Sequence, residues 1–167
     1  MKPFYNTPER IAALRLAAGE MLDTPFSAHA MIPGVAVDCV HVNGYAYLQS
    51  KLLTAPEYIL PRYALDAGSH SKESQLLKWL DHHPKFQRLE LATFNVVLPP
   101  LICGDTICFN LGLSEHHVAL MLDEKHFEHV LCSVNRRVIV SSLDESYYRR
   151  HVTAVYRPIE LEVSDVR

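Results

Sequence analysis

The 167-residue chain lacks the features that mark several specialised classes of protein. It has 16 Lys and Arg against 19 Asp and Glu, a net charge of −3 with His neutral, so there is no basic excess for nucleic acid to bind. No apolar run reaches the length of a membrane span. Its four Cys are too few for a disulfide scaffold of this size, which favours reduced thiols. We therefore expect neither a nucleic-acid partner nor a membrane span.

The N-terminal segment also lacks a secretory signal, because its single Lys is followed by no hydrophobic stretch. We expect a cytoplasmic protein, or one that leaves the cell without a signal peptide. The sequence has no internal repeat, low-complexity segment or Gly/Ser linker. Residues 1–167 are therefore expected to form one domain.

What the chain does contain differs between its two halves. Apolar spacing, N-cap residues and prolines predict helices over about 8–22, 38–52 and 71–82, the last within an enlarged helical segment at about 54–98. Short runs rich in Val, Ile and Phe predict strands at 105–111, 117–123, 126–131, 137–142 and 152–157. A short amphipathic helix over 144–150, rich in Tyr and Arg, is expected to cover the sheet. Helices followed by strands predict an α+β fold, with N-terminal helices packed on an antiparallel sheet of about five strands.

Cys39 occupies a position that suits a nucleophile. It follows Asp38, a plausible N-cap, at the start of the second predicted helix. The unpaired N–H groups of a helix N-terminus carry partial positive charge, which favours the thiolate over the thiol. The alternative is that Cys39 is a small apolar core residue.

Two of the ten histidines could serve such a cysteine, because a thiol nucleophile needs an imidazole base and a polar group that orients it. His117 and His129 lie in consecutive predicted strands. If the connecting loop is 123–125, Ala119 faces His129, and the two histidines are diagonal neighbours on one face of the sheet. A two-residue loop would place them on opposite faces, so the site depends on the length of this loop.

Taken in order, these motifs resemble the NlpC-type cell-wall peptidases, which are papain-like cysteine peptidases. The resemblance rests on Asp38-Cys39 at a helix start, Gly104-Asp105 before a strand, His117-Val118 opening the next, and Phe127-Glu128-His129 after a tight turn. It extends from about residue 11 to residue 158. Within the family, the signal-less type carried by phages and gene-transfer particles is the most similar branch, which makes phage tail or particle components possible partners.

The resemblance implies a papain-like fold and a role for each matching residue. Cys39 would be the nucleophile that forms an acyl-enzyme, His117 the general base and His129 the residue that orients His117. The backbone N–H of Cys39 would donate to the oxyanion. The substrate would be an amide bond of a peptidoglycan stem peptide, with the γ-D-glutamyl–diamino acid bond as the family's usual target, and no cofactor would be needed.

The sequence departs from the family pattern around the expected substrate pocket. Phe26 stands where a Tyr often completes the oxyanion pocket, Val40 and His41 replace a small and an apolar residue, and Ala119 replaces a common Gly. The residues expected to line the pocket are Phe26, Asp38, His41 and His116.

Several further interpretations of these residues remain. A slipped register would exchange His116 for His117, and His126 could replace His129 as the third member. A zinc site could draw on Cys103, Cys108, His116, His117 and Cys132, although their spacing is wrong for a zinc knuckle. At the level of function, the alternatives are a papain-like thiol acyltransferase or amidase that acts outside the cell wall, and a non-catalytic phage structural module.

Overall fold

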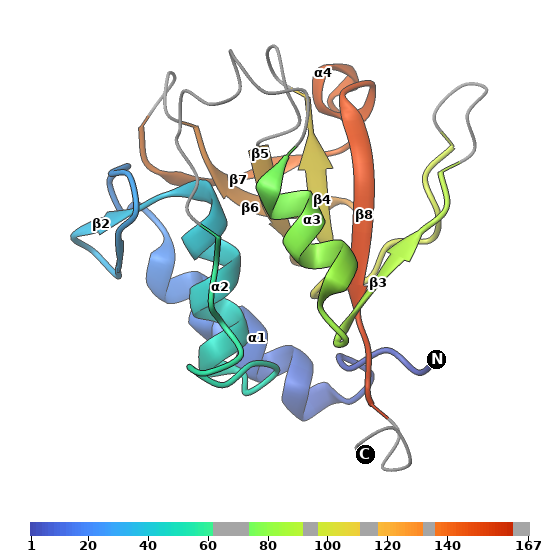
Figure 1. Cartoon of the computed structure of the whole chain (residues 1–167). Coiled ribbons are helices and arrows are strands. Elements are labelled where there is room, and N and C mark those ends of the chain that lie inside the picture. Colours follow the sequence, from blue (N-terminus) through green and yellow to red (C-terminus); the bar gives the residue numbers. More distant parts are fainter. Residues whose placement is uncertain (62–73, 92–96, 111–116, 132–135, 162–167) are drawn as a thin grey trace.

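The computed structural model describes residues 1–61, 74–91, 97–110, 117–131 and 136–161. Its helices are α1 (Pro8–Met21), α2 (Cys39–Gln49), α3 (Gln75–His82) and α4 (Ser146–Arg149). Its strands are β1 (Met31–Ile32), β2 (Ala36–Val37), β3 (Phe86–Leu89), β4 (Thr106–Phe109), β5 (His117–Met121), β6 (His126–Val130), β7 (Val138–Ser142) and β8 (Val152–Pro158). The predicted α+β class is confirmed (Figure 1).

The main sheet has six strands in the order β3-β8-β4-β5-β6-β7, and every neighbouring pair is antiparallel. The expected antiparallel sheet of about five strands is confirmed, with β3 as a further strand in the segment expected to be helical. Its four residues are too few for a clear alternating pattern, and the strand forms by pairing with β8 from the far end of the chain. A separate two-stranded sheet, β1-β2, occupies the loop before Asp38.

The ends of the first two helices follow from local chemistry. Thr7 caps α1, and Pro8 occupies its first turn, where a missing N–H costs nothing. In α2, the predicted end at residue 52 is wrong because Lys51 adopts a positive φ of 62° after Ser50, which stops the helix at Gln49. Helix α3 starts at Gln75, with the Ser74 hydroxyl accepting from the Leu77 N–H. The earlier start predicted for it, at residue 71, lies outside the described residues.

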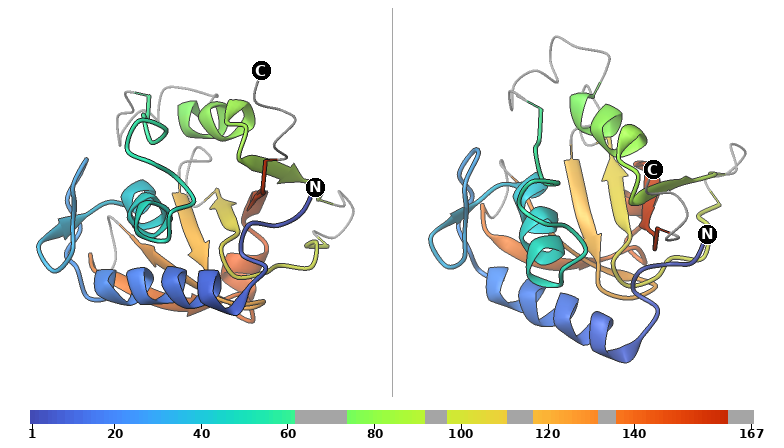
Figure 2. Two further views of the ribbon diagram at one scale, coloured as in Figure 1. Left: turned by 90° about the horizontal axis from the view of Figure 1, so that it is seen from below. Right: turned by 60° about the horizontal axis from the view of Figure 1, so that its bottom comes forward.

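Two hydrophobic clusters fill the two faces of the sheet. The first joins α1, α2 and α3 to sheet residues such as Val118, Leu120 and Tyr156. The second contains Phe109, Phe127 and other sheet residues together with Tyr148 of α4. As Figure 2 shows, α2 lies between α1 and β5. Within the described parts of the chain, no helix is long and apolar enough to cross a membrane.

Candidate active site

Asp38 is the N-cap of α2 and is fully buried. Its Oδ1 accepts from the backbone N–H of His41 at 3.0 Å and lies 2.7 Å from the Nδ1 of the same residue. Its Oδ2 accepts from the N–H of His29 at 2.7 Å. The carboxylate thus ties the preceding loop to the first turn of α2, and the predicted helix start is confirmed. Cys39 is the first residue of this helix and is 8% exposed.

The hairpin β5–β6 has the three-residue connection, 123–125, that brings His117 and His129 together. Its register pairs Leu120 with Glu128 and Met121 with Phe127, and the N–H of Leu122 donates to the carbonyl of His126 at 2.8 Å. The His117 Nε2 lies 2.9 Å from the His129 Nδ1, so one ring donates a hydrogen bond to the other. The predicted register and shared face are therefore confirmed.

Aromatic side chains surround the two imidazoles. The ring of His117 lies 5.8 Å from Phe109, and the ring of His129 lies 5.0 Å from Phe127 and 5.4 Å from Tyr148, between ring centroids. Burial lowers the pKa of His117 to about 3, with a further contribution from His129, and burial lowers the pKa of His129 to about 4. Both rings are therefore neutral at pH 7, the form in which an imidazole can accept a proton.

Contacts between α2 and the sheet show that this helix and β5 run in the same direction. At the near end, Val40 and Val118 line one small cavity, and further along Asn43 Nδ2 donates to the Ala119 carbonyl at 3.2 Å. At the far end, the Tyr47 hydroxyl donates to the carbonyl of Gly104, beside the end of β5. Cys39 and His117 therefore begin their elements at the same end of the molecule.

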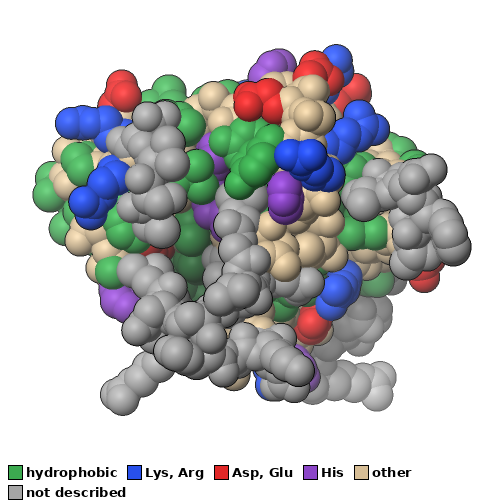
Figure 3. Space-filling view, turned by 90° about the horizontal axis from the view of Figure 1, so that it is seen from above, with side chains coloured by type: hydrophobic (Ala, Val, Ile, Leu, Met, Phe, Trp, Pro, Cys, Tyr) green, Lys and Arg blue, Asp and Glu red, His purple; other side chains and the backbone are tan. Residues whose placement is uncertain are grey.

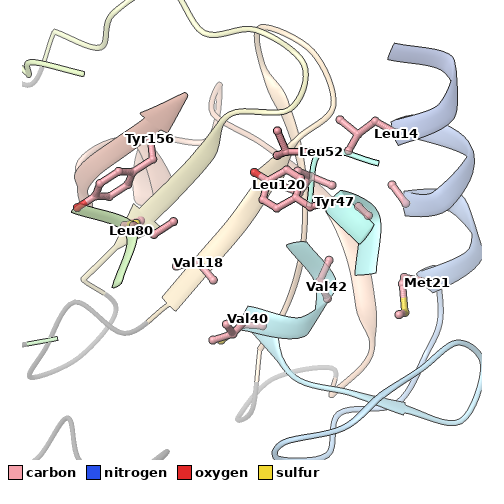
Figure 4. Packing of buried hydrophobic residues seen from close by; sticks show 14 of the residues in the cluster. Leu14, Met21, Val40, Val42, Tyr47, Leu52, Leu80, Val118, Leu120 and Tyr156 are labelled. Carbon is pink, nitrogen blue, oxygen red and sulfur yellow. The ribbon is translucent and has the colours of Figure 1, made fainter. Parts of the chain in front are cut away.

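The figures agree with this alignment. Figure 1 shows α2 and β5 starting together at the upper end, and Figure 4 shows Val40 beside Val118. Figure 3 looks onto this end, where histidine side chains border a hollow in the surface. Cys39 packs in the first hydrophobic cluster, whereas the two histidine rings contact aromatic side chains of the second. The two clusters lie on opposite faces of the sheet, so a site that uses all three residues would lie at its end, where α2 and β5 begin.

Three of the four residues expected to line the substrate pocket, Phe26, Asp38 and His41, lie near the start of α2. The backbone of Phe26 bridges to Val37, directly before Asp38, and its side chain is partly buried. Asp38 and His41 form the cap described above, and the His41 ring lies 6.0 Å from that of Tyr58. His116, as a pocket residue or as a substitute for His117, lies outside the described residues.

The geometry argues against two alternatives: His126 as the third site residue, and a zinc ion bound by the cysteines. His126 is exposed at the turn, with its Nδ1 2.9 Å from Asp123, so it does not occupy the place of His129. Cys103 and Cys108 are buried core residues. Among the residues that the structure describes, no three His, Cys, Asp or Glu side chains are grouped to hold a metal, while His116 and Cys132 lie outside them.

Sequence reasoning missed three residues near the site: Asn43, Tyr58 and Ser141. Asn43 anchors α2 to β4 and β5, and Tyr58 is a partly buried residue whose hydroxyl donates to the Val40 carbonyl at 3.4 Å. Burial raises the pKa of Tyr58, and the nearby charges of Asp38 and Cys39 act in the same direction. Ser141 lies 2.9 Å from His129 Nε2. No motif or spacing marks these residues, since each acquires its role through a contact with a distant segment.

Comparisons with known proteins identify this fold. Neither a protein-family model nor a curated protein matches the sequence. Among solved structures, an NLP/P60 family protein similar to a lipoprotein, from Staphylococcus aureus, matches with a TM-score of 0.60 and 20% identity, over 95% of this chain and 44% of that one. The peptidoglycan hydrolase RipB of Mycobacterium tuberculosis matches with a TM-score of 0.56 and 20% identity, over 95% and 69%. NlpC2 from Trichomonas vaginalis matches with a TM-score of 0.54 and 18% identity, over 91% and 47%.

This chain thus spans less than half of two of these proteins and about two thirds of the third. At such identities the likeness establishes the fold, and the predicted resemblance to the NlpC-type papain-like fold is confirmed.

Proposed function

We propose that the protein is a cysteine peptidase or amidase that hydrolyses an amide bond of peptidoglycan stem peptides through an acyl-enzyme on Cys39. The observation that carries the proposal is the hydrogen-bonded pair His117–His129, located at the end of the sheet where α2 begins with Cys39. The fold adds support, because a structural neighbour with the same fold is described as a peptidoglycan hydrolase.

In the first half of the reaction, His117 acts as general base. Its Nε2 is occupied by the bond to His129, which leaves Nδ1 to accept the thiol proton of Cys39. The sulfur attacks the scissile carbonyl carbon, and the resulting oxyanion accepts from the Cys39 N–H, because the first N–H groups of a helix have no acceptor within the helix itself. The tetrahedral intermediate then loses the amine, to which His117 returns the proton, and a thioester remains on Cys39.

Water completes the cycle. His117 removes a proton from a water molecule that attacks the thioester carbonyl, and the carbon–sulfur bond breaks to release the acid. The proton then returns to the sulfur of Cys39. His129 holds the His117 ring in place throughout, as the third member of such sites does.

The experiment that tests the function uses purified muropeptides and mass spectrometry. The wild-type protein is expected to release a stem-peptide fragment, and Cys39→Ala is expected to release none. Cys103→Ala is the matched control, because Cys103 is buried to the same degree, 7% against 8% exposed, but is not at a helix start. Full hydrolysis by Cys39→Ala would overturn the proposal.

Alkylation provides a second readout that needs no substrate. Burial raises the pKa of Cys103, while the helix N-terminus favours the thiolate of Cys39. Iodoacetamide at pH 7 is therefore expected to label Cys39 faster than Cys103, as followed by peptide mass spectrometry. If wild-type protein labels at Cys39 but cleaves no muropeptide, the reactive thiol acts on another acyl substrate.

A further inference from the structure

The hydrogen-bonded pair of histidines continues to a third side chain, Ser141 on β7. The His129 Nε2 lies 2.9 Å from the Ser141 Oγ, and His129 is fully buried while Ser141 is 8% exposed. The β6–β7 register pairs Phe127 with Ser141 and His129 with Ile139, which makes Ser141 the diagonal neighbour of His129 on the same face. The three side chains therefore form one row across β5, β6 and β7.

A row of neutral imidazoles can carry its protons in only two ways. Each neutral ring has one nitrogen that donates and one that accepts. If the Nε2 of His117 donates to the Nδ1 of His129, then the Nε2 of His129 carries a proton and donates to the Ser141 Oγ. If instead Ser141 donates to His129, both rings reverse, and the Nδ1 of His117 carries the proton.

Only the arrangement in which His129 donates to Ser141, here called the first, suits the proposed function. In it the Nδ1 of His117 is unprotonated and can accept the thiol proton of Cys39. A hydroxyl oxygen is a suitable acceptor for the His129 N–H, and the aromatic rings that flank His129, Phe127 and Tyr148, offer no comparable lone pair. The hydroxyl can serve either arrangement, but without it the first would bury the His129 N–H with no partner, which costs more than the unpartnered ring nitrogen of the reversed arrangement.

We propose that Ser141 is a positioning residue that accepts from His129, fixes the tautomer of that ring and thereby keeps the Nδ1 of His117 ready to accept a proton. The inference rests on the proposed function, since it assigns to Ser141 a role in preparing the same base. It adds Ser141 as a fourth site residue to Cys39, His117 and His129, the three that the sequence suggests.

The first test compares kinetics of Ser141→Ala, Ser141→Thr and Ser142→Ala on muropeptides. Ser141→Ala is expected to lower kcat by about tenfold or more with little change in KM, because the loss of one hydrogen bond allows the reversed arrangement. Ser141→Thr retains the hydroxyl and is expected to stay within a few-fold of wild type. Ser142→Ala is the matched control on the neighbouring position, where the hydroxyl accepts from the Asp144 N–H.

The second test reads the tautomers directly and does not depend on hydrolysis. Long-range proton–nitrogen NMR spectra are recorded in a Cys39→Ala background with and without Ser141→Ala. With Ser141 present, both His117 and His129 are expected to carry the proton on Nε2, and its removal is expected to shift both rings toward the Nδ1–H form. Unchanged tautomers would overturn the role of Ser141, whatever the substitution does to kcat.

The two tests separate this inference from the function on which it rests. If wild-type protein cleaves no muropeptide but the tautomers respond to Ser141→Ala, the substrate assignment fails while the role of Ser141 stands. If the enzyme is active and depends on Cys39 but the tautomers ignore Ser141, the role of Ser141 fails alone.

Discussion

The Nε2 of His117 lies 2.9 Å from the Nδ1 of His129, across a hairpin whose turn consists of only three residues. Strand residues alternate between faces, so a change of one residue in this turn moves one histidine to the other face of the sheet. The turn is largely exposed, yet its length sets the relation between two buried rings.

Deleting Glu124 tests that relation. We expect the shorter turn to shift β6 by one residue and to separate the two rings, with a loss of muropeptide hydrolysis of about 10²-fold or more. Glu124→Ala keeps the turn length and is expected to retain wild-type activity. Equal activity of the deletion and the substitution would show that the spacing is unimportant.

Acid should weaken the fold through the two histidines. In the folded chain the pKa of His117 is about 3 and that of His129 about 4, below the usual value near 6.5. At a pH between the folded and the usual value, the unfolded chain therefore binds more protons than the folded chain. The stabilising contribution is complete above pH 6.5 and is lost as the pH falls through 4 to about 3. Urea unfolding at several pH values is expected to show a less steep decline for His117→Gln than for wild type. An NMR titration that finds ordinary pKa values for both rings would refute this expectation.

Glu128 should act in the opposite direction. It is 1% exposed, its Oε1 has no hydrogen-bond partner among the described residues, and burial raises its pKa to about 8. Because the folded chain holds this proton more tightly, its contribution is complete below about pH 4.5 and is lost as the pH rises to about 8. At pH 8.5, Glu128→Gln is expected to be more stable than wild type by about 4–5 kcal/mol, with little difference at pH 4.5. The same pH slope in both proteins would contradict this account.

Gly44 should be intolerant of a methyl group although it lies within a helix. A Cβ at this position would overlap the ring and hydroxyl of Tyr58, which pack directly on α2. Ala normally favours a helix over Gly by about 1 kcal/mol, yet we expect Gly44→Ala to lower the free energy of unfolding by about 1–3 kcal/mol.

Gly19 in α1 is the control for this substitution, because a Cβ there would meet no atom within 4 Å. Gly19→Ala is expected to stabilise the protein by about 0.5–1 kcal/mol in the same thermal or urea measurement. Stabilisation by both substitutions would show that Tyr58 moves aside without cost.

The class of fold and the main elements could be read from local pattern. Asp38 before Cys39, Thr7 before Pro8 and the runs of Val and Ile from residue 105 onward act over a few residues, so they are visible in the sequence. Strand β3 was missed because its stability comes from pairing with β8, about 70 residues later, rather than from its own four residues. Similarly, the end of α2 depends on the backbone of Lys51, a residue type that gives no stop signal.

For the candidate site, the sequence by itself determined the cap and the first residue of α2, and it determined that a three-residue turn would place His117 and His129 on one face. Both follow from short-range rules, helix capping and the two-residue period of strands. Only the tertiary structure decided that α2 lies parallel to β5, that Tyr58 packs on its first turns and that Ser141 reaches His129. These contacts join segments separated by loops whose closure depends on the packing of the whole core, and no local pattern of residues encodes them.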